Sequence, residues 1–426
     1  MTASTFSRRL WQVAARRLTL VASVALVFVS ADRAIGTRGT VIAAGRLESS
    51  ATAATDATDG LFDATQLQEI RLWINTRDLA QLRTHFDENT FYPADLWWRG
   101  TRVRNVGVRS RGFGSRNPVK IGLFVDLDRY TTGQQLAGVS AFVLDNFWQD
   151  PSMLREFLAM AFFNRMGVPA PREAFARLYV NNVYEGVYAL VEDIDARFIA
   201  RTLGRADGTL FEYHWTRPFF GEDLGDLNAY VPMFEPRTHE QDAPGMLWGP
   251  LADWWRAVNG PDDAAWRAEV SRYVDLEQFV TQAAIENYLA ENDGLLGYAG
   301  MDNFYCYREP GTTRHRLFPW DKDTAFLQVD FAPYRGVDEN RLMLRAMAQP
   351  DLRALYESAL LAAAALDSDE AWLLSRADAA AALIRDAAYA DPRKRTTNDE
   401  FAAAVQQIRD FATNRAAFIR DRLSGR

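Results

Sequence analysis

The sequence predicts a mixed α+β fold, with a β-rich first part that carries one helix and a larger, mostly helical second part. Segments rich in β-branched and aromatic residues, bounded by Gly, Asn and Pro, are concentrated between residues 65 and 195. Beyond residue 200, long segments repeat their apolar residues at helical spacing. The chain has 426 residues, 48% of them hydrophobic, which is enough for one large core or two medium ones. Two such parts, or lobes, are expected to enclose a cleft.

The N-terminal residues 1–35 have the organisation of a signal peptide. Arginines precede an apolar run at residues 18–29, and small residues follow near Ala31. We therefore expect an extracytoplasmic protein, whether secreted, periplasmic or at the cell surface. The alternative is an uncleaved membrane anchor at residues 18–31, which would be the only membrane contact. Residues 36–64, rich in Ala, Thr, Ser, Gly and Asp, predict a flexible linker.

Residues 65–195 form the predicted β-rich lobe. We expect strands at residues 70–75, 96–109, 120–128 and 176–192. The last of these contains a hairpin that turns at Asn181-Asn182. One helix is predicted between the strands, because Asp150 can cap it, Pro151 suits its first position and Gly167 can end it.

Residues 196–426 form the predicted helical lobe. A short β pair interrupts its helices and is joined through Pro310-Gly311. The expected helices span residues 251–258, 264–273, 276–292, 340–366, 369–390 and 397–423, and the expected strands span residues 303–308 and 315–320.

Charge and composition exclude several classes of function. A net charge of -8 and a pI near 5.3 argue against nucleic acid as a partner, since a phosphate backbone needs clustered Lys and Arg. With one cysteine and four histidines that lack ligand spacing, a thiolate or zinc site is not expected. A bound metal would have oxygen ligands, as magnesium, manganese and calcium prefer. The sequence does not indicate an oligomeric state.

The most informative motif flanks the predicted β pair of the second lobe. Asp293 follows a long helix, Asp302-Asn303 precede the first strand, and Asp321-Lys322-Asp323 follow the second. Because a hairpin returns the chain to where it began, these groups are expected to meet. Phosphoryl transfer needs this set: one carboxylate orients the acceptor hydroxyl, and an Asn and a second carboxylate hold metal against the phosphates. Taken singly, each residue is as readily explained as a turn or cap residue.

The first lobe offers a loop that could contact phosphates. The loop after residue 108 contains Arg111, two glycines and then Lys120, one of only three lysines in the chain. Backbone N–H groups and a cation in such a loop suit phosphate oxygens. Glu156 lies on the lone helix, where a kinase-like lobe supplies a carboxylate to the phosphate-binding lysine. Glu192 ends the lobe, where an interlobe hinge is expected.

Five ordered blocks resemble the CotH family of spore-coat and secreted bacterial kinases, and together they cover about residues 65–330. The blocks are Val108 to Lys120, Asn146 to Arg155, Gly167 to Pro171, Tyr179 to Glu192, and Asp293 with Asn303-Phe304-Tyr305 and Pro319-Trp320-Asp321-x-Asp323.

The resemblance implies an atypical protein kinase-like fold with ATP and Mg²⁺ or Mn²⁺ in the interlobe cleft. Asp293 would be the catalytic aspartate, although Asp302 competes with it for this role. Asn303, Asp321 and Asp323 would hold metal. Lys120, Arg111, Glu156 and Glu192 would form the ATP site, and the acceptor would be a hydroxyl of a protein Ser or Thr or of a small molecule.

Two readings from other classes compete with an active kinase. A catalytically weak surface or coat protein could use the same fold as a binding module. A carbohydrate-binding or hydrolysing protein would need a carboxylate pair flanking an aromatic cleft. The convergence of Asp293, Asn303 and Asp321 favours the enzyme, because a scaffold has no need of these groups.

Overall fold

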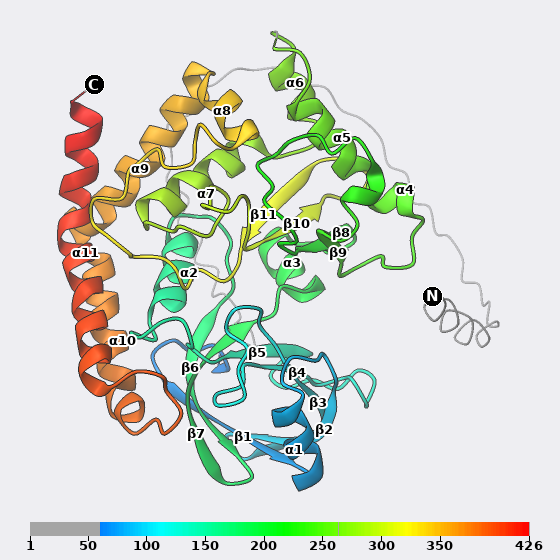
Figure 1. The fold of residues 1–426 in the computed structure, drawn as a ribbon, viewed down its shortest axis with the longest axis vertical. Coiled ribbons are helices and arrows are strands. Elements are labelled where there is room, and N and C mark those ends of the chain that lie inside the picture. The colour runs from blue at the N-terminus through cyan, green and yellow to red at the C-terminus, as the bar shows by residue number, and fades with distance from the viewer. Residues whose placement is uncertain (1–59, 263, 426) are drawn as a thin grey trace, which may run out of the picture. The chain divides into compact units, whose positions relative to one another are not determined.

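A computed structural model describes residues 60–262 and 264–425 (Figure 1). The predicted signal peptide and most of the predicted linker lie outside the described residues. Within the described ranges, no helix is both long and apolar enough to cross a membrane. The described part combines strands and helices, so the expected mixed α+β class is confirmed.

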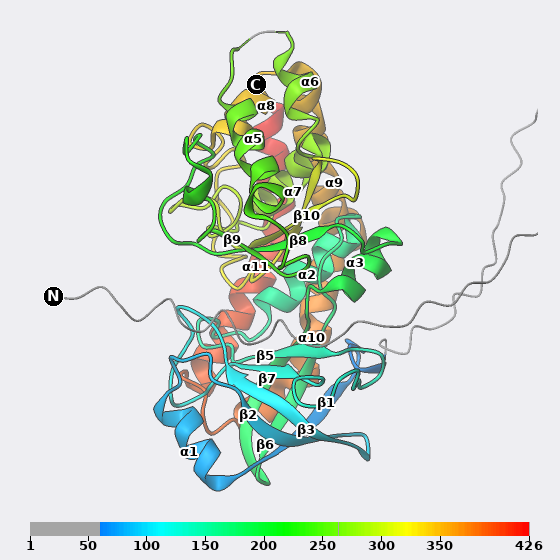
Figure 2. The same cartoon turned by 90° about the vertical axis from the view of Figure 1, so that its right-hand side faces the viewer.

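Seven strands between residues 67 and 192 close into a barrel in the order β1-β2-β3-β4-β5-β7-β6. Figure 2 shows most of these strands together at one end of the described part. Neighbouring strands are antiparallel except β1 and β6, whose parallel pairing closes the barrel. The strands are β1 (Leu67–Ile74), β2 (Tyr92–Trp98), β3 (Thr101–Ser110), β4 (Leu123–Asp126), β5 (Ala141–Asp145), β6 (Glu173–Val180) and β7 (Val183–Glu192).

Alternating side chains fill the barrel. In β1, the residues Ile70, Leu72 and Ile74 are buried while their neighbours are more exposed. They belong to one apolar cluster with Leu96 and Leu190 from other strands. A period of two is the strand pattern with one face toward a core, so the sequence itself specifies which face of β1 points inward.

Several predicted boundaries of this part are wrong. The single strand expected at 96–109 covers the end of β2 and most of β3. The two strands are joined by a turn at Arg99-Gly100, where both residues have positive φ. Helix α1 (Thr76–Thr84), which Asn75 caps through its side chain, and strand β5 were not predicted. The first part therefore has more than the one expected helix. The hairpin at Asn181-Asn182 is confirmed, and its positive φ values are those of a type I′ turn.

The predicted lone helix is α2 (Arg155–Arg165), and it begins later than expected. The Asp150 carboxylate accepts hydrogen bonds from the N–H groups of Ser152, Leu154 and Arg155 at 2.8–2.9 Å. Asp150 therefore organises a turn that leads into the helix, rather than the first helical turn itself. The helix is buried almost throughout, and α10 packs against both α2 and β7.

The second part holds a four-stranded sheet in the order β11-β10-β8-β9, together with further helices. Strands β8 (Thr209–Tyr213) and β9 (Phe234–Pro236) were not predicted, whereas β10 (Phe304–Arg308) and β11 (His315–Pro319) match the expected pair. The helices are α3 (Ala196–Leu203), α4 (Pro244–Leu247), α5 (Gly249–Val258), α6 (Trp266–Val270), α7 (Leu276–Tyr288), α8 (Arg341–Met347), α9 (Pro350–Glu370), α10 (Trp372–Tyr389) and α11 (Asn398–Ser424).

Helices α3 and α4 were not predicted, and three predicted helices differ from the observed ones. The helix expected at 264–273 spans only the residues of α6. The helix expected at 340–366 is divided into α8 and α9 at Pro350, which lacks an N–H group and begins α9. The helix expected at 276–292 ends at Tyr288. Residues 289–303 therefore form a loop before β10, and this loop carries the acidic groups of the predicted site.

Candidate active site

The C-terminal end of α7 is held by the buried side chain of Arg415 from α11. Its guanidinium donates hydrogen bonds to the carbonyls of Asn287 and Tyr288 at 2.6 and 2.9 Å. It also donates to the carbonyls of Val329 and Phe331 at 2.6 and 2.7 Å. A cation at a helix C-terminus satisfies carbonyls that have no partner within the helix. The loop after α7 therefore starts from a fixed point.

Two buried charged residues hold the loop itself. The Lys322 Nζ donates to the Asn303 carbonyl at 2.9 Å and lies 3.3 Å from Glu286 Oε1. The other Glu286 oxygen accepts the Leu295 N–H at 2.6 Å. A Cβ atom on Gly294 would overlap this carboxylate, so only glycine fits there. Lys322 thus joins α7, the loop and the end of β11.

Asp293 and Asn303 are in direct contact. The Asn303 amide nitrogen donates to the Asp293 carbonyl at 2.8 Å and to its Oδ2 at 3.2 Å. The β10–β11 pairing places Phe304 opposite Pro319, and the Trp320 N–H donates to the Asn303 carbonyl at 3.1 Å. The hairpin therefore brings its two ends together, as the sequence predicts.

Backbone conformation distinguishes Asn303 and Asp321, which have φ values of 57° and 48°. Non-glycine residues with positive φ are uncommon and cluster at functional sites. Both side-chain hydrogen bonds of Asn303 are donated by its amide nitrogen. Within the described part of the chain, its Oδ1 accepts none. That oxygen is free to serve as a ligand.

Asp302 stays close to Asp293. Its Oδ1 accepts the Asn303 N–H at 2.8 Å, and its own N–H donates to the Gly294 carbonyl at 3.0 Å. Burial, assisted by the charge of Asp293, raises the pKa of Asp302 to about 7. Burial also raises the pKa of Asp293. The geometry keeps both carboxyls in one loop, and the choice of Asp293 over Asp302 stays a prediction.

Asp321 lies near Arg111 of the predicted phosphate loop. The Arg111 guanidinium lies 5.0 Å from the centre of the Trp320 ring. Burial raises the pKa of Asp321, while the charges of Arg111 and Lys322 act in the opposite direction. Asp321 in turn favours the charged form of Arg111. The structure thus places Arg111 beside the acidic group.

More carboxyls surround Asp321 than Arg111 can neutralise. Asp145, at the end of β5, has its pKa raised by burial and by the charge of Asp321. Burial, Asp321 and Asp145 together raise the pKa of Asp323 well above its ordinary value. Like charges crowded in a desolvated site cannot all ionise without a counter-ion.

Glu156 extends this acidic cluster from α2. Burial and the charge of Glu173 raise its pKa well above the ordinary value, and Asp321 and Asp145 add to the effect. Both carboxyl oxygens of Glu173 are buried without a hydrogen-bond partner among the described residues. Contrary to the expectation for a kinase-like lobe, Glu156 forms no ion pair with Lys120 in the described part of the chain.

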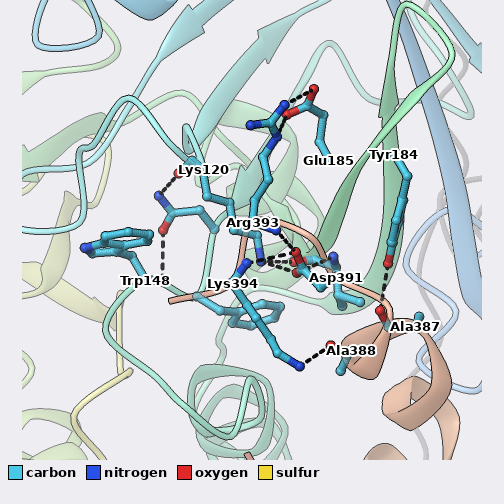
Figure 3. A network of polar contacts seen from close by, with 12 residues as sticks. Lys120, Trp148, Tyr184, Glu185, Ala387, Ala388, Asp391, Arg393 and Lys394 are labelled. Carbon is cyan, nitrogen blue, oxygen red and sulfur yellow. Dashed lines mark hydrogen bonds and ion pairs between the residues drawn. The ribbon is translucent and has the colours of Figure 1, made fainter. Parts of the chain in front are cut away.

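Lys120 is held elsewhere (Figure 3). Its Nζ donates to Asp391 Oδ2 and to the Val187 carbonyl, each at 2.7 Å, and the side chain is buried. Asp391 also accepts the N–H groups of Val187, Arg393 and Lys394 at 2.9–3.0 Å. The Lys120 ammonium therefore joins the barrel to the segment between α10 and α11. They give no support to the predicted contact between Lys120 and phosphates.

Gly186 makes room for this ion pair. Its φ is 122°, and a Cβ atom there would overlap the Asp391 carboxylate. The glycine lies in β7, within one of the blocks that carry the family resemblance. Glycine is therefore required at this position because the Asp391 carboxylate approaches the strand backbone closely.

Glu192 belongs to a separate ion-pair group. It accepts hydrogen bonds from the guanidinium groups of Arg172 and Arg201, at 2.7 and 2.6 Å. These contacts occupy both of its oxygens. Its predicted place in the ATP site therefore finds no support in its surroundings.

Sequence reasoning missed several residues of the site. Asp145, Glu173, Glu286 and Asp391 carry no signal of their own, because each is a single acid in an ordinary strand, helix or turn. Lys322 did carry a signal, since lysine is rare in this chain and here stands between two aspartates.

A separate group lies at strands β8 and β9. Glu212 is in β8, His214 follows that strand and Glu235 is in β9, and their ligand atoms lie within 4.8 Å of one another. It already has internal partners: His214 Nε2 lies 2.7 Å from Glu235, and Arg237 lies 3.3 Å from Glu212. Such a metal-binding arrangement was not expected from histidine spacing, because its ligands come from two strands.

The acidic cluster around Asp321 suits a divalent cation. Its carboxylates and the free amide oxygen of Asn303 are the oxygen donors that magnesium and manganese prefer. Few cations lie nearby to compensate the charge of these carboxylates. Arg111 and the N–H groups of its loop can face phosphate oxygens. The arrangement is suited to hold a metal–phosphate group next to a carboxylate that could accept a proton.

Comparison with protein families gives a match to the model described as "CotH kinase protein" over residues 108–419. Among curated proteins, the inner spore coat protein H of Bacillus subtilis (strain 168) is 22% identical over 371 residues, covering 83% of this chain and 97% of that protein. Invasin CotH3 of Rhizopus delemar is 25% identical over 248 residues, covering 51% of this chain and 39% of that protein.

Two solved structures are also similar. The HipA–HipB–operator DNA complex of Shewanella oneidensis MR-1 matches 83% of this chain and 73% of its own, with a TM-score of 0.34 and 11% identity. The proinflammatory kinase CtkA of Helicobacter pylori matches 74% of this chain and 94% of its own, with a TM-score of 0.29 and 10% identity. The family assignment rests on the sequence match alone.

Proposed function

Since this chain belongs to the family of CotH kinase proteins, we propose that it is an ATP- and divalent-metal-dependent kinase that transfers a phosphoryl group to a hydroxyl. The contact between Asp293 and Asn303, at the mouth of a hairpin that ends in Asp321, carries this proposal. The proposed architecture is a two-lobed kinase-like fold, with residues 65–195 and 196–426 on either side of the site.

In this proposal, Asn303, Asp321 and Asp323 hold the metal. The ion, when bound, neutralises the negative charge of the ATP phosphates. The raised pKa values of Asp321 and Asp323 support this role, because carboxyls that are costly to ionise alone become stable as anions beside a cation.

Arg111 takes the part that Lys120 was expected to play. Asn117 and Asn146 tie the loop that follows it: both amide nitrogens donate to the Lys120 carbonyl, at 3.2 and 2.7 Å. A loop held in this way presents its N–H groups and one guanidinium without further ordering. Arg111 would therefore bind phosphate oxygens, and Lys120 would support the loop from behind.

Asp293 orients the acceptor hydroxyl. As the acceptor oxygen forms its bond to the γ-phosphorus, the bond from that phosphorus to the bridging oxygen of ADP breaks, and the hydroxyl proton passes to the Asp293 carboxylate. Asn303 holds that carboxylate in place through its amide nitrogen. The acceptor would be a protein Ser or Thr or a small-molecule hydroxyl, and nucleic acid is not a proposed partner.

Incubation of the purified protein with ATP and Mn²⁺, followed by intact mass spectrometry, tests the proposal. We expect phosphate adducts on the protein itself or on added acceptor proteins, and none with Asp321→Ala. ATP that remains intact, with no adduct on any acceptor, would contradict an active kinase.

A second candidate function is a catalytically weak surface protein that keeps the fold for binding. The engagement of Lys120 by Asp391 favours it, because the expected phosphate-binding lysine is not available. This candidate predicts ATP binding without turnover, so measured ADP release separates the two.

We also propose that the protein acts outside the cytoplasm. The predicted signal peptide at residues 1–35 supports this, as do relatives named as a spore coat protein and invasins. Sequencing the N-terminus of natively expressed protein tests it, and an intact Met1 on cytosolic protein would contradict it.

A further inference from the structure

A cavity of about 440 Å³ lies between α2, the start of β6 and α10. Four arginines from different elements line it: Arg165, Arg172, Arg201 and Arg376. Small-molecule sites have volumes of roughly 300–1,000 Å³, so this space is large enough for an organic ligand. The proposed kinase site uses none of these arginines.

Arg376 is the most informative of the four. Among residues 60–262 and 264–425, no carboxylate pairs with it and no hydrogen bond involves its side chain; its Nε is buried without a partner. Its guanidinium lies 5.2 Å from the Phe157 ring centre, and burial lowers its pKa. A partly buried cation without a counter-ion is costly unless an anion binds beside it.

The neighbouring charges leave room for such an anion. Arg165 pairs with Glu370 at 2.8 Å, but both side chains are about half exposed, so this pair can be exchanged at small cost. Glu173 also lines the cavity, and burial raises its pKa well above the ordinary value. A raised pKa favours the neutral carboxyl, which reduces its repulsion of an anion.

Aromatic rings form the other walls. Phe62, Phe157 and Trp372 line the cavity, and Trp372 packs edge-on against Phe162 at 5.7 Å between ring centres. Trp372 is only partly buried, so its ring is available to a flat group. Rings beside arginines favour ligands that combine an aromatic surface with an anionic end.

From this juxtaposition we propose that the cavity binds a small phosphate monoester attached to a flat ring, such as an aryl or nucleoside phosphate. Arg376 and Arg165 would hold the phosphate, since arginine binds phosphate oxygens in a bidentate manner. The ring would lie against Trp372. The cavity adjoins the acidic cluster, because Glu173 lines it and the charge of Glu173 also raises the pKa of Glu156.

Calorimetric titration of the purified full chain with phenyl phosphate tests the inference. We expect saturable binding that persists in the presence of saturating Mg²⁺ and a non-hydrolysable ATP analogue, because the proposed kinase site is then filled. Inorganic phosphate is expected to bind at least about tenfold more weakly, since it lacks the ring.

Arg376→Ala is expected to weaken phenyl phosphate binding at least about tenfold. Arg385→Ala, on the same helix with an exposed side chain, is the matched control and should leave affinity unchanged. Trp372→Ala provides a second readout, because it should remove the advantage of phenyl phosphate over phosphate whether or not Arg376→Ala folds. Binding that is absent, competed by the ATP analogue, or insensitive to both Arg376→Ala and Trp372→Ala would overturn the inference.

Discussion

Lys120 and Arg111 lie on the same loop, yet their charges have different partners. Lys120 contacts Asp391, between α10 and α11, whereas Arg111 lies beside Trp320 and Asp321. The sequence could place both on one loop but could not show which of them faces the site, because the partner of Lys120 is 271 residues away. Residue type alone therefore favoured Lys120 as the phosphate-binding residue, whereas the fold favours Arg111 for that role.

We expect Lys120→Met to destabilise the protein by about 3–5 kcal/mol, because it leaves the Asp391 carboxylate buried without its cation. Chemical denaturation measures this loss. Lys394→Met is the matched control, since Lys394 is less buried and bonds mainly to the Ala388 carbonyl and to Asn398; it should cost far less. A Lys120→Met protein of normal stability that has lost ATP affinity would restore the phosphate role to Lys120.

The catalytic carboxylate can be identified by paired substitutions. We expect Asp293→Asn to lower kcat at least about a hundredfold with little change in the KM for ATP, the pattern of a contact made only in the transition state. Asp302→Asn should have a much smaller effect, because Asp302 bonds to the backbone N–H of Asn303, whereas Asp293 contacts the Asn303 side chain that is proposed to hold metal. Steady-state kinetics on the two variants decides between them, and an inactive Asp302→Asn beside an active Asp293→Asn would reverse the assignment.

At the scale of elements, turns and strands with a local sequence signal were predicted, whereas strands that depend on long-range pairing were not. The turn at Asn181-Asn182 and strands β10 and β11 follow from the sequence, since turn residues and alternation are local. Strand β5, flanked by partners from distant segments, and the short β9 have no comparable signal. The meeting of Asp293 and Asn303 was predictable because one hairpin controls it, whereas the contribution of Asp145 depends on the closure of the barrel.

The loop after α7 depends on Gly294. We expect Gly294→Ala to lower stability by about 1–3 kcal/mol, because the added methyl group overlaps the Glu286 carboxylate that holds Lys322. The same displacement should lower kinase activity at least about tenfold. Thermal unfolding and an ADP-release assay measure the two effects.

Gly245→Ala in α4 is the control for this loop. A Cβ atom there meets nothing within 4 Å, so neither stability nor activity should fall. If Gly294→Ala behaves like Gly245→Ala, then the Glu286–Lys322 contact does not organise the loop.

At the scale of the whole molecule, carboxyls are buried in excess of cations around the site. The pKa values of Asp193, Glu291 and Asp302 are each raised to about 7, chiefly by burial. Composition could predict an acidic protein and oxygen-ligand metal chemistry. It could not predict this excess, because the acids come from separate elements and only the fold removes them from water.

This excess predicts the pH dependence of stability. An acid whose pKa is higher in the folded state binds its proton more tightly there, so between pH 4 and 7 the folded state carries more protons than the unfolded state. The free energy of unfolding of metal-free protein should therefore fall as pH rises from about 4 to about 7. Thermal melts in EDTA at pH 5, 6, 7 and 8 measure this, and Asp302→Asn should flatten the trend. A melting temperature that rises steadily over this range would contradict the assignment.

Calorimetric titration with ATP is the most direct test of the central claim, that the cluster around Asp321 binds ATP through a divalent metal. We expect ATP to bind in Mg²⁺ or Mn²⁺ and much more weakly in EDTA. Asp321→Ala should abolish the metal-dependent part while the protein keeps its fold, as judged by circular dichroism. Equal ATP affinity with and without metal, or metal-dependent binding that survives in Asp321→Ala, would contradict the account.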